Sequence, residues 1–256
     1  MESAEQRHRT NLERANALAE LVEERLPMDF KVSSDDADLW PMVGAGLLSR
    51  ATTTLRHVFD AGSHGQRIDA ATLARSLYEH VVHLAWLAAE PSAARMQAWR
   101  KVDLIARRRA DTDARAVGEQ LLDDSARASI QAQIVLMTGP ERLKLTDLAV
   151  EADKHWAGKL PGMGPHTERD SFRGFYAVLY RSYSTTAHPT FMGLNHVVED
   201  SPTGHRVVIE KPPEGRGPFG MTTIVYAYGL HVAAASLGWP DAWRINDAFD
   251  RYPATP

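Results

Sequence analysis

Residues 168–199 read ERDSFRGFYAVLYRSYSTTAHPTFMGLNHVVE and contain the densest run of aromatic side chains in the chain. Phe172, Phe175 and Leu179 recur three or four residues apart, which is the spacing of one face of an α-helix. Pro189 disfavours helical geometry at the residue before it, so we expect the helix to end there. The stretch therefore predicts a central helix around which other helices pack.

Apolar residues at helical spacing also fill most of the remaining chain. The expected helices are 3–26, 36–59, 70–89, 93–116, 124–137, 146–157, 219–237 and 241–250. The connection 200–218 is rich in turn residues, and its apolar run Val207–Ile209 allows at most a short β-hairpin near 205–211. We predict an all-α fold, a multi-helix bundle that forms a single helical domain over 1–256, with core helices at 36–190 and 219–237.

Local signals predict details of these helices. Asp69 and Ser92 are expected N-caps of helices 70–89 and 93–116, because their side chains accept from free backbone N–H groups. Gly44 and Gly46 are interpreted as points of close packing. The basic face of 100–115 is interleaved with Asp103, Asp111 and Asp113, which favours a solvated surface over an RNA track.

Composition excludes several classes of protein. Of the 256 residues, 44% are hydrophobic, which supports a real core. The formal charge of −4 argues against a dedicated basic nucleic-acid binder, and we expect no DNA partner. The absence of cysteine excludes disulfides, thiolate metal sites and cysteine nucleophiles. No apolar run reaches the ~18 residues that a membrane span needs, so we expect no membrane partner and a cytoplasmic location.

A polar column follows the aromatic helix. Arg181 and His188 are seven residues apart, so they share one helix face, and Tyr180, Ser184 and His188 step by four along nearly the same strip. A histidine at a helix C-terminus beside a permanently charged arginine is an acid/base group paired with an anion-stabilising group. In the alternative, His188 caps the last carbonyls while Arg181 is solvated.

A second polar column lies on the helix at 70–89. Arg75, Glu79 and His83 are four residues apart, so Arg75 and Glu79 are placed to form an ion pair. The pair supports Arg181 or His188 in one interpretation. In the other, it is structural and orients two helices.

Glu79, His80 and His83 also form E-H-x-x-H. The glutamate lies outside the histidine pair, unlike in the H-E-x-x-H of zinc proteases. We therefore expect no metal and no other cofactor. A metal-dependent hydrolase that uses these residues with a distant histidine is the weaker alternative.

The sequence RSYSTTAH at 181–188 has the R-x(4–6)-H form of HEPN domains and resembles that superfamily. Together with Arg75-x-x-x-Glu79 and Tyr180-x-x-x-Ser184, the pattern is most similar to an uncharacterised bacterial helical family of unknown function. The resemblance covers roughly 67–190. It implies a helical bundle acting as a metal-independent ribonuclease of a toxin or phage-defence system. RNA would be the substrate, and a homodimer would place the motif at its interface.

The resemblance also implies roles for individual residues. Arg181 and His188 would be catalytic, positioning the scissile phosphate and assisting attack by the RNA 2′-hydroxyl. Glu79, Arg75, Tyr180 and Ser184 would support them. The alternative is a non-enzymatic helical sensor or interaction module, which predicts that Arg181, Glu79 and His188 are buried and bonded to one another.

Overall fold

The computed structural model describes residues 4–26, 28–30, 36–160, 171–181, 183–184, 198–202, 204–207 and 218–252. Helices make up most of this part of the chain, and two short strands form the remainder of its regular structure. The elements are α1 (Ala4–Arg25), the 3-10 helix η1 (Asp36–Leu39), α2 (Trp40–Ser63), α3 (Arg67–Ala89), α4 (Ala93–Ala116), α5 (Asp124–Leu136), α6 (Leu145–Trp156), α7 (Phe172–Phe175), the π-helical turn η2 (Tyr176–Tyr180), β1 (Val198–Ser201), β2 (Gly204–Val207), α10 (Phe219–Leu237) and α11 (Trp243–Arg251). The predicted all-α bundle is confirmed.

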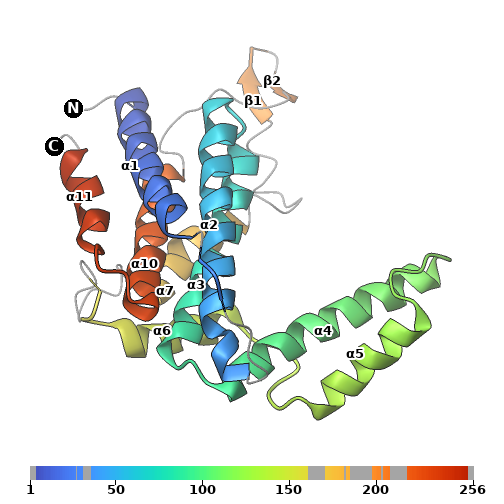
Figure 1. Ribbon diagram of the computed structural model, residues 1–256. Coiled ribbons are helices and arrows are strands. Elements are labelled where there is room, and N and C mark those ends of the chain that lie inside the picture. The colour runs from blue at the N-terminus through green and yellow to red at the C-terminus, as the bar shows by residue number, and fades with distance from the viewer. Residues whose placement is uncertain are drawn as a thin grey trace.

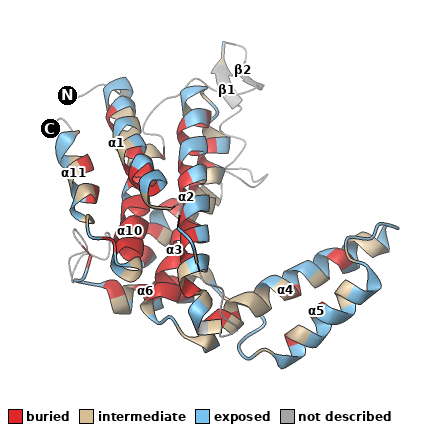
Figure 2. Cartoon of the chain, viewed as in Figure 1, coloured by how far each residue is buried: buried red, intermediate tan, exposed pale blue. Residues whose placement is uncertain are grey.

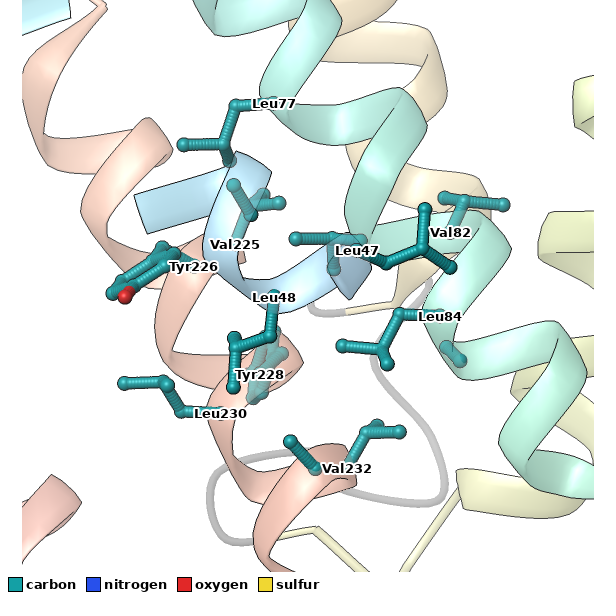
Figure 3. Packing of buried hydrophobic residues seen from close by; sticks show 14 of the residues in the cluster. Leu47, Leu48, Leu77, Val82, Leu84, Val225, Tyr226, Tyr228, Leu230 and Val232 are labelled. Atoms are coloured by element: carbon teal, nitrogen blue, oxygen red, sulfur yellow. The ribbon is translucent and has the colours of Figure 1, made fainter. Parts of the chain in front are cut away.

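The core of the bundle lies where α2, α3 and α10 meet (Figure 1). Leucine, valine and tyrosine side chains from the three helices interdigitate there, as Figure 3 shows. Gly229 lets α10 approach α3 closely, since a Cβ atom on it would lie 3.0 Å from Val81 Cγ2. The Tyr226 hydroxyl is 2.6 Å from that of Thr52, which itself donates to the Leu48 carbonyl, so the buried phenol donates to Thr52.

The helices α4 and α5 leave the bundle as a projecting two-helix arm, which we define as residues 100–136 (Figure 1). Much of its surface is exposed (Figure 2). Ile105, Ile130 and Ile134 form a small apolar cluster of its own. The sequence pattern predicted both helices but not their departure from the bundle.

The turn between α4 and α5 is organised around the buried Asp111 carboxylate. It accepts hydrogen bonds from Arg115 Nε at 2.9 Å and Arg127 Nη1 at 3.0 Å. The backbone N–H groups of Leu121 and Leu122 donate to it at 3.2 and 2.9 Å. The expectation that Asp111 belongs to a solvated face was therefore wrong, because the chain reversal brings donors onto it from three sides.

The two strands form an antiparallel hairpin in which Val198 pairs with Val207 and Ser201 with Gly204. A short hairpin was expected near 205–211, so it occurs earlier than predicted. Val208 and Ile209 lie outside the described residues. An apolar run alone does not define the register of a hairpin, because the length of the connection also contributes to it.

Among the described residues, no helix is both long enough and apolar enough to span a bilayer.

Candidate functional site

The helix α3 and the π-helical turn η2 meet at Arg75 and Tyr180. Arg75 Nη2 donates to the Tyr180 hydroxyl at 2.9 Å, and the guanidinium carbon lies 4.6 Å from the centre of the tyrosine ring. Such cation–π contacts contribute roughly 0.5–2 kcal/mol, depending on exposure. One turn further along α3, Glu79 Oε1 lies 3.4 Å from Arg75 Nε. The predicted Arg75–Glu79 ion pair is confirmed, and Tyr180 joins it.

Three tyrosines fix the position of η2 against α3. The rings of Tyr176 and Tyr180 stack at 5.0 Å with an interplanar angle of 17°. The Tyr78 ring lies 6.4 and 5.9 Å from them. Its hydroxyl donates to the Phe172 carbonyl at 2.6 Å, and burial raises the pKa of Tyr78 far above its ordinary value. This stack holds Tyr180 in one place on α3.

The N-terminal end of the aromatic helix is anchored by Asp153 of α6. Its carboxylate accepts from the backbone N–H groups of Phe172 at 2.8 Å and Arg173 at 3.0 Å. Ser171 caps the helix by accepting from the Gly174 N–H at 2.9 Å. Burial raises the pKa of Asp153, although the backbone N–H donors oppose that rise. The first turn is therefore held to the bundle at a defined point.

The turn at Tyr176–Tyr180 is π-helical rather than α-helical. A π-helical turn contains more residues than an α-helical one, so it changes the faces on which later side chains lie. Such turns occur frequently at functional sites. The strip of side chains four residues apart, predicted from a regular α-helix, therefore does not continue unchanged through Tyr180.

The electrostatic environment keeps the Tyr180 phenol protonated at neutral pH. Burial raises its pKa first, and the Glu79 carboxylate raises it further, while the Arg75 guanidinium opposes both effects. Tyr180 accepts from Arg75 through its oxygen and hydrogen-bonds through its hydroxyl to the Glu79 carboxylate, so the phenol links the cation to the carboxylate. The cluster of Arg75, Glu79 and Tyr180 thus combines a cation, a carboxylate and a neutral phenol.

The predicted site residues are only partly brought together. Arg181 is exposed, and it has no hydrogen bond or ion pair within the described part of the chain. Ser184 is half-buried. His188 lies outside the described residues, so its role beside Arg181 stays a prediction.

Sequence reasoning missed Tyr78, Tyr176 and Asp153 as parts of this arrangement. The spacing by four of Tyr176 and Tyr180 was a signal for the stacking of their rings. No local signal pointed to Asp153, because it lies on another helix, 19 residues before the backbone group it accepts from.

Within the described residues, no group of three or more His, Asp or Glu side chains is arranged to hold a metal ion. His80 and His83 of the E-H-x-x-H pattern have no third side chain of this kind in position there. Nothing in this part of the chain supports the metal-dependent alternative.

The fold and the cluster define a helical-bundle protein with a polar, tyrosine-rich site between α3 and η2. The chain belongs to DUF5677, a family of unknown function, whose family model matches residues 42–205. The match includes Arg75, Glu79, Tyr180, Arg181 and His188, so the expected membership of a helical family of unknown function is confirmed. No curated protein and no solved structure matches the chain.

Proposed function

We propose that this protein is an HEPN-like, metal-independent ribonuclease in which Arg181 and His188 are the catalytic residues. The supporting residues hold in place the surface from which Arg181 extends and supply its charged and polar groups; they are Arg75, Glu79, Tyr180 and Ser184. The proposal includes a homodimer and a role in a bacterial toxin or defence system. The single observation that carries it is the exposed Arg181, which has no partner within the described residues and directly follows a Tyr180 held by Arg75.

The chemistry follows from the residue types. His188 takes the proton of the RNA 2′-hydroxyl, whose oxygen forms a bond to the adjacent phosphorus while the bond to the 5′-oxygen breaks. Arg181 stabilises the negative charge that gathers on the phosphate oxygens. A proton passes to the leaving 5′-oxygen, so the products carry a 2′,3′-cyclic phosphate and a 5′-hydroxyl. DNA has no 2′-hydroxyl and would not be cleaved.

Two features of the described residues support this function: Arg181 is exposed, and its neighbour Tyr180 is held in place. An arginine that binds a phosphate must reach solvent, as Arg181 does. The adjacent Tyr180 is held by stacking and by Arg75, which limits the motion of the backbone that carries Arg181. A positioned cation stabilises developing charge without reorganisation during the reaction.

The test is cleavage of fluorophore-labelled single-stranded RNAs of varied sequence with excess EDTA present. We expect cleavage to 2′,3′-cyclic phosphate ends, with Arg181→Ala slower by about 100-fold and His188→Ala by about 100-fold or more. Arg173→Ala is the matched control, because Arg173 is another exposed arginine on the same helical segment. Equal cleavage by wild type and both site variants would point to a contaminating nuclease and contradict the proposal.

The second candidate function is a non-enzymatic interaction module. The pairing of Arg75, Glu79 and Tyr180 favours it, but its prediction that Arg181 is buried is wrong, since Arg181 is exposed. It predicts that Arg75→Ala lowers the melting temperature and that neither the wild-type protein nor any variant cleaves RNA. The two candidates differ at Arg181. Only the ribonuclease loses activity in Arg181→Ala while the melting temperature stays unchanged, since an exposed side chain contributes little to stability.

A further inference from the structure

A second face of α3, next to the one that carries Arg75, lines an open groove of about 1060 Å³ between α2 and α3, with α4 forming a further wall. We call it the α2–α3 groove. Glu79 lies at its border with the tyrosine cluster. Its polar lining includes Arg50 and His57 of α2 and His80 and His83 of α3.

Arg50 contributes a positive charge that has no counter-ion among the described residues. Its side chain is exposed, and its guanidinium forms no ion pair or hydrogen bond with the part of the chain that the structure describes. The two carboxylates that also line the groove have other partners, since Glu79 pairs with Arg75 and Asp103 Oδ2 lies 2.9 Å from Arg107 Nε. The groove therefore presents a permanent cation whose charge is not locally neutralised.

The two histidines present a second feature that packing alone does not explain. Nδ1 of His80 and Nδ1 of His83 are both buried, and neither has a hydrogen-bond partner among the described residues. Burial lowers the pKa of both rings, that of His83 to about 4, so both are neutral at pH 7. A buried N–H without an acceptor costs roughly 1–3 kcal/mol, more than a bare lone pair, so the proton of each ring belongs on Nε2.

Because Nδ1 of each ring is buried while both rings line the groove, we infer that Nε2–H faces it. The guanidinium of Arg50 and the rings of His80 and His83 thus line the same groove, and Arg50 is near enough to His80 to lower the pKa of its ring. We propose that the α2–α3 groove binds a phosphate group, with Arg50 supplying the charge and the Nε2–H groups of His80 and His83 donating to its oxygens. The site is distinct from Arg181, and the proposal does not depend on the ribonuclease function.

The phosphate could belong to a small molecule or to an RNA strand, and calorimetric titration separates the two. The probes are inorganic phosphate, a nucleoside monophosphate and a non-cleavable 2′-O-methyl oligoribonucleotide. We expect saturable binding of at least the first two, weakened about 10-fold or more in Arg50→Gln. Arg173→Gln, which removes an exposed arginine outside the groove, should bind as wild type does. Tightest binding of the oligonucleotide would identify a strand as the source.

The imidazole resonances give a readout that a purely structural role would not change. Added phosphate should shift the ring signals of His80 and His83 in wild type and leave them unchanged in Arg50→Gln. The inference is overturned if phosphate does not bind at millimolar concentration, or if Arg50→Gln binds it as tightly as wild type. Either result leaves the Arg181 proposal unaffected, because that proposal is tested by cleavage.

A different observation, the surface of the arm, carries a second inference. Four large aliphatic side chains are exposed on it: Val117 and Leu121 at the tip are 78% and 63% exposed, and Val135 and Leu136 at the base are 72% and 81% exposed. Isolated apolar residues on a surface are ordinary, but two pairs at opposite ends of one projecting arm are not explained by the packing of this chain.

Charge is divided along the arm in the same way. The segment 100–109 at its base has five basic residues against one acidic, and the segment 111–127 around its tip has five acidic against two basic. The tip of one arm is therefore complementary to the base of another in both charge and apolar surface. An antiparallel pair related by a two-fold axis satisfies both complementarities at once.

We propose that the arms of two copies of this chain associate antiparallel, so that Val117 and Leu121 of one copy contact Val135 and Leu136 of the other. The helix from Asp124 to Val135 rises about 17 Å, and Leu121 precedes it, so the contacts at the two ends of the pair are well apart. This interface differs from one that is formed by the motif around Arg181.

The absence of cysteine from the natural chain makes cross-linking a clean test. An equimolar mixture of Leu121→Cys and Val135→Cys proteins should form a disulfide-linked dimer under mild oxidation, several-fold more than either protein alone. Val178→Cys, an exposed position on η2, is the control for a dimer through the motif face. Sedimentation should show a dimer that weakens with salt, because the charges at the interface are screened.

A monomer at about 100 μM, or cross-linking in the Val178→Cys protein but not in the mixture, would overturn the arm interface. Leu121→Cys and Val135→Cys lie on exposed positions, so loss of folding is not expected to obscure the result.

Discussion

His83 couples folding to pH because its ring is buried between α2 and α3 as a neutral group. Its pKa is about 4 in the folded protein, against about 6.5 in an unfolded chain. The unfolded state thus binds a proton at a higher pH than the folded state does. Stability from this residue is fully present above pH 6.5 and is lost as pH falls from there to 4.

We predict that acidification from pH 7.5 to 4 costs wild type about 3 kcal/mol more than it costs His83→Gln, since glutamine does not titrate. Urea unfolding at several pH values measures the difference. Other acid-labile groups act on both proteins equally, so the comparison isolates His83. Parallel stability–pH curves for the two proteins would refute the assignment.

The negative charge of Asp111 neutralises two arginines, Arg115 and Arg127, at the tip of the arm. Burial alone would raise its pKa, but the Leu122 N–H and the Arg115 and Arg127 guanidinium groups outweigh burial and hold the pKa below its usual value. We predict that Asp111→Asn loosens the tip of the arm, because an amide does not neutralise the two arginines. Hydrogen exchange of the Leu121 and Leu122 amides should accelerate, whereas the exposed Asp113→Asn leaves both rates unchanged. Protected amides in Asp111→Asn would contradict this.

At the scale of elements, two glycines of α2 have opposite surroundings. A Cβ atom on Gly46 would meet nothing within 4 Å, whereas one on Gly62 would lie 2.1 Å from the Phe219 ring. Phe219 is confined by the rings of His8 at 4.5 Å and Phe59 at 5.2 Å. The interpretation of Gly44 as a packing point is confirmed by the Trp40 ring at 2.9 Å, but the same interpretation of Gly46 was wrong.

We predict opposite signs for the two alanine substitutions. Gly46→Ala should raise the free energy of unfolding by about 0.5–1 kcal/mol, because alanine has the higher helix propensity and space is free. Gly62→Ala should lower it by about 1–3 kcal/mol, because overpacking against Phe219 exceeds that gain. Chemical denaturation measures both, and a stabilised Gly62→Ala would show that Phe219 is free to move.

Local signals predicted some helix ends and missed others. Ser92 caps α4 as predicted, accepting from the Arg95 N–H at 3.3 Å. The helix 219–237 was predicted with its observed ends. Asp69 is not a cap, because α3 begins two residues earlier and Asp69 lies within its first turn. A cap residue and a first-turn acid are both favourable at a helix N-terminus, so composition alone does not separate them.

On the scale of the whole molecule, α10 is the element on which the bundle depends. The family match ends at residue 205, yet Val225, Tyr226, Leu230 and Val232 of α10 are fully buried in the core. The region that the family model matches thus leaves out a helix that packs into the core of this chain. That the whole of 1–256 folds as a single domain stays a prediction.

We predict that a chain truncated after residue 217 does not fold, although it contains the entire matched region. Loss of α10 exposes the faces of α2 and α3 that it covers, and each large apolar side chain left exposed costs about 1.5–3 kcal/mol. Circular dichroism and urea unfolding would show no cooperative transition. A chain truncated after residue 240, which keeps α10, is the control. Cooperative unfolding of the shorter chain would contradict the central role of α10.

The periodicity of apolar residues, the prolines and the glycines were enough to predict an all-α protein and the positions of most helices, because these signals act within one or two helical turns. The Arg75–Glu79 pair belongs to the same category, since residues four apart on a helix are neighbours on its surface.

The contact between Arg75 and Tyr180 joins residues 105 positions apart, and only the packing of η2 on α3 decides it. The same holds for the π-helical turn, for the projection of the arm and for the burial of Asp111. A periodic pattern says which face of a helix is apolar, but the element that covers that face depends on contacts between distant segments.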